Sequence, residues 1–203
     1  MTTLLYAVMD LGTSVEGCTA PGGRPLRIVG DDGLGAVVSE LDGHLHMDEP
    51  SLWAHEHAIE QLMDRGSLLP ARFGTTAQDE REILQMLRDR RNELEAALER
   101  VRGAVEYAVH VDTGAEPVGA SAAGGGTGVA YMRGLLAQRR HERELMERVE
   151  SQLGDLARAV TVLSSTSLAC LVPRERVSEF VARAETYALS ISGPWPPYSF
   201  VTP

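Results

Sequence analysis

Residues 68–111 restrict the possible folds of this chain more than any other stretch. They begin with an apolar run at 68–75 that contains Gly74, continue into a long amphipathic segment, and end in a second apolar run at 105–111. In the amphipathic segment, apolar residues recur at helical steps that are interrupted only around Arg91: Ile83, Leu84, Leu87, Leu94, Leu98 and Val101. The pattern predicts a strand, a helix and a strand.

The ends of this helix carry start and stop signals. Thr75 is followed three residues later by Gln78, which is the spacing of a capping box. Acidic side chains then occupy the first turn, where the helix dipole favours negative charge. Gly103 can adopt the left-handed conformation that ends many helices. We therefore expect one helix between Thr75 and Gly103.

The rest of the first half adds strands and one more helix. Residues 4–9 form a continuous apolar run, typical of a strand covered on both faces. Residues 26–29 and 34–38 flank a Gly-Asp-Asp-Gly turn and predict a β-hairpin. Helix-start residues at 48–51 precede an apolar stripe that stops at Gly66: Leu52, Ile59, Leu62 and Met63. The expected order is β, β-hairpin, α, β, α.

The second half predicts a ferredoxin-like domain. After a Gly-rich linker at 112–128, a long helix is expected at 131–156, with a wholly polar middle that either projects beyond its sheet or pairs with the preceding helix. A hairpin at 159–172, a helix after Pro173 and a strand around 187–191 follow. From Val105 onward the order is βαββαβ.

The fold class is therefore α+β with two domains. Residues 1–103 would form an N-terminal domain, with a mixed sheet and two helices. Residues 104–203 would form the ferredoxin-like domain, with its long helix, the linker at 112–128 and an ordered C-terminal tail. The linker is expected to be mobile and dispensable for folding.

Composition excludes several classes of partner. The formal charge of −10 disfavours nucleic acid and anionic membranes, because both need clustered cations. No apolar run reaches the roughly 20 residues needed to span a bilayer, and the first residues lack the basic start of a signal peptide. Cys18 and Cys170 form neither a disulfide framework nor a zinc motif. We expect a cytoplasmic protein.

The histidines do not form a recognisable metal motif. His55-Glu56-His57 differs from HExxH because Ile59 stands in the second histidine's place. A solvated helix surface is the preferred interpretation of these three residues. His44 and His46, with Asp48 and Glu49 nearby, leave a weaker metal hypothesis open.

No catalytic constellation is present either. Residues 124–128 are glycine-rich and precede a helix, but no lysine follows and no GxGxxG is complete, so a linker explains them better than a phosphate cradle. No GxSxG motif occurs. We expect no catalytic residues, no metal and no cofactor.

Two peptides carry more information than ordinary structure requires. In residues 69–75, Pro70 interrupts an apparent strand and indicates an edge or bulge. Arg72 lies between Ala71 and Phe73, and if buried it needs hydrogen-bond partners. A structural role that ties strand to helix and a partner-binding role both remain open for Arg72.

The second peptide, residues 192–200, contains three prolines and three aromatic residues. Prolines restrict the unfolded peptide, so ordering it costs less entropy. We expect the tail to pack on its own chain, with residues 199–201 resuming strand pairing and Trp195→Ala costing several kcal/mol. The alternative is a docking surface for another subunit.

These peptides resemble the two signature peptides of the gas vesicle protein F/L (GvpF/GvpL) family. The segments at 4–8, 35–40, 55–56 and 128–131 resemble that family too, so the similarity covers nearly the whole chain. Two departures are Met132, where leucine is expected, and a longer Gly-rich linker. The resemblance marks these candidate interaction or structural residues: Pro70, Arg72, Phe73, Gly74, Gly193, Pro194, Trp195, Pro196, Pro197, Tyr198 and Phe200.

The resemblance implies a non-enzymatic accessory or minor structural protein of gas vesicle assembly. Its expected partner is the small hydrophobic shell protein, with other gas vesicle accessory proteins as further partners. The expected location is the cytoplasm, in association with gas vesicles. The competing hypothesis is a small-molecule-binding or enzymatic ferredoxin-like protein, which a cleft lined by converging polar groups would favour.

Overall fold

A computed structural model describes residues 2–41, 43, 45–111, 128–187 and 189–201. The chain separates into two compact α+β units, Met1–Val105 with Trp195–Pro203, and Glu106–Pro194. The second unit is thus inserted in sequence between two parts of the first. These units differ from the predicted domains 1–103 and 104–203 chiefly in the tail: the sequence predicts it in the second domain, whereas residues 195–203 belong to the first unit.

The first unit is built around β1 (Thr2–Asp10), the central strand of a sheet with the order β4-β5-β1-β6. β1 pairs antiparallel with β5 along its length and, at its other edge, with β6 and then β7. The remaining strands of this unit are β2 (Thr19–Ala20), β3 (Arg24–Pro25), β4 (Arg27–Asp31), β5 (Leu34–Leu41), β6 (Leu68–Pro70) and β7 (Thr76–Ala77). Leu4 to Met9 are all buried, as expected of a strand covered on both faces.

The predicted β-hairpin is confirmed as β4 and β5, joined by Asp32 and Gly33. Both joining residues have positive φ, 47° for Asp32 and 93° for Gly33. Two consecutive left-handed residues match the right-handed twist of the flanking strands, which is why Asp-Gly is a strong hairpin signal.

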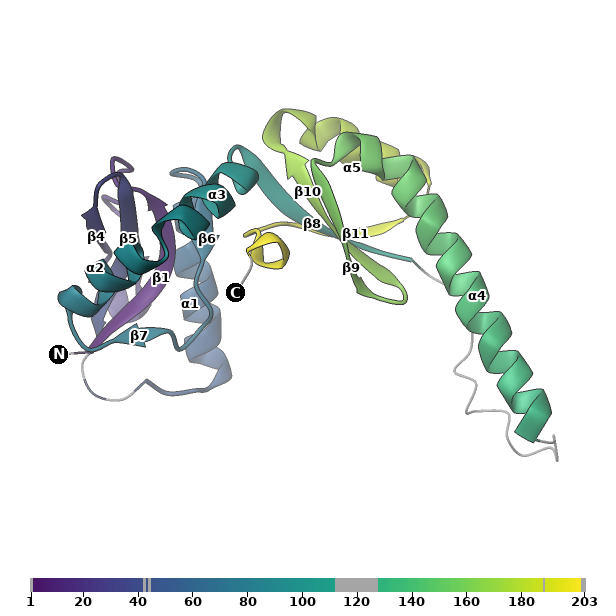
Figure 1. Cartoon of the computed structure of the whole chain (residues 1–203), viewed down its shortest axis with the longest axis horizontal. Helices are drawn as coiled ribbons and strands as arrows, with labels where there is room; N and C mark the ends of the chain where they lie inside the picture. The colour runs from purple at the N-terminus through teal and green to yellow at the C-terminus, as the bar shows by residue number, and fades with distance from the viewer. Residues whose placement is uncertain (1, 42, 44, 112–127, 188, 202–203) are drawn as a thin grey trace. The chain divides into compact units, whose positions relative to one another are not determined.

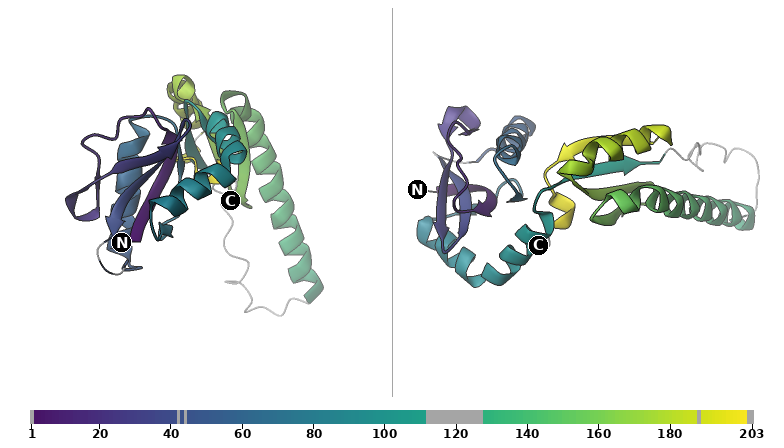
Figure 2. Two further views of the ribbon diagram at one scale, coloured as in Figure 1. Left: turned by 60° about the vertical axis from the view of Figure 1, so that its left-hand side comes forward. Right: turned by 90° about the horizontal axis from the view of Figure 1, so that it is seen from above.

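Helices cover both faces of this sheet: α1 (Glu49–Met63) lies on one face, and α2 (Glu80–Asp89) and α3 (Arg91–Val101) lie on the other (Figures 1 and 2). The single predicted helix between Thr75 and Gly103 is wrong in two respects. It is broken at Arg90, whose φ of −107° and ψ of 15° lie outside the helical region. It also begins later, because Asp79 rather than Thr75 accepts the capping hydrogen bond, from the Glu82 amide.

The second unit has the predicted ferredoxin-like topology. Its elements follow the order β8 (Ala104–His110), α4 (Gly128–Leu153), β9 (Ala159–Ser164), β10 (Ser167–Pro173), α5 (Val177–Thr186) and β11 (Ser190–Trp195). The sheet order is β11-β8-β10-β9, so β8 lies between the last strand, β11, and the β9–β10 hairpin. The N-terminal part of α4 runs on beyond the strands of this sheet (Figure 1). The polar middle of α4 does not lie wholly beyond the sheet: Glu142 is buried, and Arg139 and Arg143 line a groove beside the β9–β10 hairpin.

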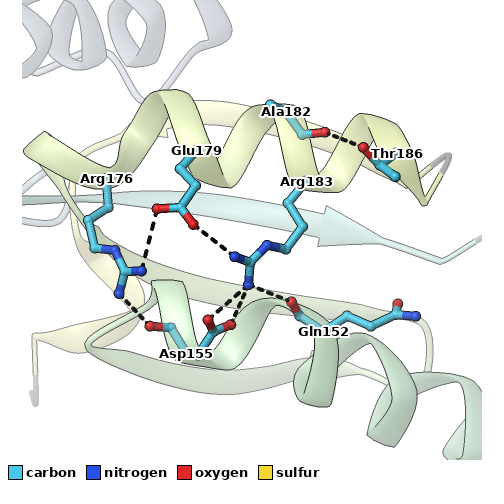
Figure 3. A network of polar contacts seen from close by, with 7 residues as sticks. All are labelled: Gln152, Asp155, Arg176, Glu179, Ala182, Arg183 and Thr186. Carbon is cyan, nitrogen blue, oxygen red and sulfur yellow. Dashed lines mark hydrogen bonds and ion pairs between the residues drawn. The ribbon is translucent and has the colours of Figure 1, made fainter.

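A polar network joins α5 to the turn that follows α4, the 3₁₀ segment Gly154–Leu156 (Figure 3). The Arg183 guanidinium donates through Nη1 to both Asp155 carboxylate oxygens, at 2.7 and 2.9 Å, and through Nη2 to Glu179 at 2.8 Å. Arg176 donates to the Asp155 carbonyl at 2.6 Å. These arginines satisfy acceptors at a helix end that the helix itself leaves unpaired.

Replacing Arg183 with methionine is expected to lower the thermal midpoint only modestly, because its partners are half exposed and water screens the ion pair. The hydrogen bond from Arg183 lowers the pKa of Asp155 below its ordinary 3.8. The contribution is therefore present above about pH 3.8 and disappears as pH falls through the lowered pKa. Thermal melts at pH 7 and pH 3 should show a larger wild-type advantage at pH 7 than at pH 3. Arg140→Met, at an exposed position without an ion pair among the described residues, is the control; an equal shift there would contradict the assignment.

Candidate functional site

A groove in the first unit brings the two signature peptides together. It has a volume of about 300 Å³ and lies between the sheet, the α2–α3 pair and the C-terminal tail. The sheet contributes Leu5 and Val8 to its floor, and α3 contributes Leu94 and Ala97. The signature residues that line it are Leu69, Pro70, Ala71, Arg72, Thr75 and Tyr198.

The first signature peptide forms one wall because it interrupts the edge of the sheet. Pro70 ends the edge strand β6, where its missing N–H leaves no gap in the ladder. The Ala71 amide still donates to the Tyr6 carbonyl at 2.8 Å, and the Leu5 amide donates to the Thr75 carbonyl at 2.9 Å. The residues between these two bonds bulge away from β1.

Arg72 stands at the tip of this bulge. Its carbonyl accepts the Thr75 amide at 3.1 Å and the Thr75 hydroxyl at 2.7 Å, which closes a tight turn. Gly74 completes the turn with a φ of 88°, a conformation that side chains rarely adopt. The Arg72 side chain is exposed and has no hydrogen-bond or ion-pair partner within the described part of the chain. A buried arginine that ties strand to helix, one of the two roles considered, is therefore not what the fold contains.

The tail forms the other wall. Pro196 and Pro197 are buried, and a 3₁₀ turn at Tyr198–Phe200 follows them. The Tyr198 hydroxyl donates to the Glu56 carboxylate of α1, at 2.9 Å from Oε1 and 3.1 Å from Oε2. Burial, and then the neighbouring Glu56 charge, raise the pKa of Tyr198, so the hydroxyl remains a donor. This hydrogen bond fixes the tail on the first unit.

Two expectations about the tail are wrong. Residues 199–201 do not resume strand pairing, because the chain turns at Tyr198–Phe200. Trp195 is not a core residue: 40% of it is exposed, whereas Phe200 is only 7% exposed. The large aromatic that the tail buries is therefore Phe200.

The interpretation of His55 as a residue on a solvated helix surface is also wrong. His55 is completely buried on the sheet side of α1. Its ring stacks on Tyr6 with centroids 4.9 Å apart, meets Phe73 edge-on at 5.4 Å, and places Nε2 3.2 Å from the Ala71 carbonyl. Burial lowers the pKa of His55, so the ring is neutral near pH 7. His55 thus supports the inner side of the first signature peptide.

The groove is apolar at its floor and charged at its rim. Arg90 forms a bidentate ion pair with Glu93, with Nη2–Oε1 and Nε–Oε2 distances of 2.6 and 3.1 Å. The hydrogen bond between them raises the pKa of Arg90 and lowers that of Glu93. Arg90, at the junction of α2 and α3, and Glu93 of α3 thus neutralise each other, whereas Arg72 has no ion-pair partner among the described residues.

The signature residues divide by location. Pro70, Arg72 and Tyr198 line the groove, whereas Phe73, Pro196, Pro197 and Phe200 support its walls from within. Gly193, Pro194 and Trp195 belong to β11. A Cβ on Gly193 would lie 2.9 Å from the Glu106 carbonyl and from the Tyr107 ring, so a close backbone approach requires glycine there.

The sequence marked residues 55–56 as a family-like segment, but it did not predict that Glu56 holds the tail or that α2 and α3 form a wall of the groove. Glu56 precedes the signature peptides by many residues and looks like an ordinary helix carboxylate. The burial of His55 did carry a signal, because Ala58, Ile59 and Leu62 follow it at steps of three, four and seven. That spacing places His55 on the apolar face of α1.

Two negative findings apply to the described residues only. No group of three His, Cys, Asp or Glu side chains there is placed to hold a metal ion. No described helix is long and apolar enough to cross a bilayer. His44 and the linker at 112–127, on which earlier hypotheses rest, lie outside the described residues.

Comparison with known proteins places this geometry in context. The family described as "Gas vesicle synthesis protein GvpL/GvpF" matches residues 2–202. Gas vesicle protein F of Streptomyces sp. (strain CB03234) is 29% identical over 213 residues, covering 88% of both chains. Gas vesicle protein L of the same strain is 29% identical over 234 residues, covering 93% of this chain and 88% of the relative.

Solved structures share the fold. The crystal structure of GvpF from Anabaena sp. PCC7120 superposes with a TM-score of 0.79 at 20% identity, covering 100% of this chain and 96% of that one. GvpF from Microcystis aeruginosa gives the same TM-score at 17% identity, covering 100% and 99%.

Proposed function

Because the chain belongs to the gas vesicle synthesis protein GvpL/GvpF family, we propose that it is a non-catalytic accessory or minor structural protein that supports gas vesicle assembly by binding the small hydrophobic shell protein. We place the contact at the groove beside Arg72. The observation that carries this proposal is the convergence there of both signature peptides, which are far apart in sequence.

The chemistry of the groove favours a protein segment over a small polar substrate. Its floor is formed by aliphatic side chains, among them Leu69 and Leu94, and its charged groups stand at the rim. Small-molecule and cofactor sites also have mostly apolar linings, but a few polar groups in them converge on the ligand. An apolar segment with a neighbouring carboxylate would fill the floor and pair with the Arg72 guanidinium.

The charge of the chain suits such a role. A net charge of −10 favours solubility. An exposed apolar partner tends to aggregate until its surface is covered. Covering one apolar segment with an acidic subunit would therefore keep the shell protein available for assembly. Other gas vesicle accessory proteins are further proposed partners; nucleic acid and membranes are not.

Co-purification with the shell protein tests this function. Arg72→Glu is expected to reduce the retained shell protein about tenfold, since a lost charge-assisted hydrogen bond is worth about 1.5–3 kcal/mol. Stability should be unchanged, because Arg72 is exposed and its side chain has no partner among the described residues.

Arg81→Glu provides the matched control. Arg81 is an exposed arginine of α2 outside the groove, and the substitution changes the net charge equally. If both variants retain equally little shell protein, the loss comes from general charge repulsion and not from the groove. Full binding by a stable Arg72→Glu protein would contradict the proposed contact.

A further inference from the structure

A second groove, in the second unit, carries opposite charges at its two ends. It lies between α4 and the β9–β10 hairpin and has a volume of about 510 Å³. The exposed charges are Arg139 and Arg143 at one end, and Glu147 and Glu150 at the other. Glu142 also lines the arginine end, but it is buried and accepts a hydrogen bond from the Gln138 side chain. Met146 lies between the two pairs and is buried.

These four charges are exposed, and none has an ion-pair or hydrogen-bond partner among the described residues. Their arrangement is symmetric along the helix. The midpoint between Arg143 and Glu147 is residue 145, and the midpoint between Arg139 and Glu150 lies just before it. At about 1.5 Å per residue, the outer two charges are about 17 Å apart along α4, too far to pair within one chain.

The strand beside this groove has an open edge. β9 is the last strand in the order β11-β8-β10-β9, and no described strand pairs with its outer side. Its side chains Val162 and Leu163 are 68% and 47% exposed. Edge strands are usually protected by charges, prolines or a covering element. β9, whose sequence is AVTVLS, contains neither charges nor prolines.

We propose that a second copy of this chain occupies this surface through a two-fold axis beside residue 145. A two-fold axis brings a patch against itself with its direction reversed. Arg139 and Arg143 of one copy then face Glu150 and Glu147 of the other, and the two β9 edges pair antiparallel. A partner of uniform charge would leave half of these groups opposed by like charge, which costs specificity.

Sedimentation equilibrium of the full chain at about 1 to 100 µM tests the proposal. This range is suitable because protein interfaces of ordinary size have dissociation constants of about micromolar or lower. The wild type is expected to dimerise. The R139E/R143E variant, in which all four exposed charges of the groove are negative, is expected to raise the dissociation constant about 100-fold. The same is expected of E147R/E150R, in which all four are positive. An equimolar mixture of the two variants should recover a heterodimer, because each supplies the charges that the other lacks.

Arg148→Glu is the control, because Arg148 is exposed on α4 but does not line the groove. It should dimerise like the wild type, and circular dichroism should confirm that all variants are folded. A monomeric wild type over the whole range, or a mixture that stays monomeric, would overturn the proposal. Retention of shell protein by the dimer-breaking variants would separate this surface from the groove beside Arg72. A monomeric wild type whose shell binding is lost in R139E/R143E would assign the surface to that partner instead.

Discussion

Replacing Phe200 with alanine is expected to lower the free energy of unfolding of the first unit by about 3 kcal/mol, the lower range for removing a buried aromatic ring. Phe200 is 7% exposed and follows two buried prolines, so its loss leaves a cavity under the tail. The tail lies at a chain end and can detach without global unfolding. Because the tail can detach in this way, the destabilisation by Phe200→Ala cannot exceed the free energy with which the tail docks on the first unit.

Hydrogen exchange of the β1 amides measures this change in the first unit alone. Trp195→Ala is the control: it removes a larger ring from the same tail, but 40% of that residue is exposed. We expect it to cost about 1 kcal/mol, in the range of ordinary substitutions outside the core. A larger effect for Trp195 than for Phe200 would show that the tail is held by its indole.

The second large effect is a pH dependence that comes from His55. Burial lowers the pKa of this ring in the folded state below its ordinary 6.5. The unfolded chain therefore binds a proton that the folded chain excludes, and stability falls as pH falls below 6.5. The loss can reach about 1.4 kcal/mol per pH unit until the pH passes the lowered pKa, because one proton is linked to unfolding.

The surroundings of His55 explain why protonation is unfavourable. The ring lies between Tyr6 and Phe73. The charge that favours the protonated form is that of Glu56, whose carboxylate already accepts the Tyr198 hydroxyl. Charging the ring would leave a cation largely surrounded by apolar groups, which is costly. Protonation is expected to loosen both walls of the groove, because His55 contacts the first peptide and its neighbour Glu56 holds the tail.

Denaturant unfolding between pH 7.5 and 5 provides the measurement. His55→Gln should be less stable at pH 7.5 but should lose the slope below pH 6.5. His57→Gln, two residues along the same helix, serves as the control, because the His57 side chain is 73% exposed. A wild-type slope that survives in His55→Gln, or disappears in His57→Gln, would contradict the assignment.

Much of the architecture follows from local patterns. The Asp32-Gly33 turn specifies the hairpin because few other dipeptides adopt two positive φ values. The βαββαβ order predicts the ferredoxin-like unit, because that order admits few compact sheet arrangements. The break at Arg90 was visible only as an interruption around Arg91, and periodicity alone does not separate one irregular helix from two.

The sequence by itself determined the element types, the α+β class, the hairpins and the two peptides that distinguish this chain, because turn chemistry and hydrophobic period are properties of neighbouring residues. The tertiary structure decided which of these residues meet. The tail packs on the first unit, Tyr198 reaches Glu56 across 142 residues of chain, and the His55 ring meets Tyr6 and Phe73. Such contacts depend on packing between segments far apart in sequence, and no local pattern encodes them.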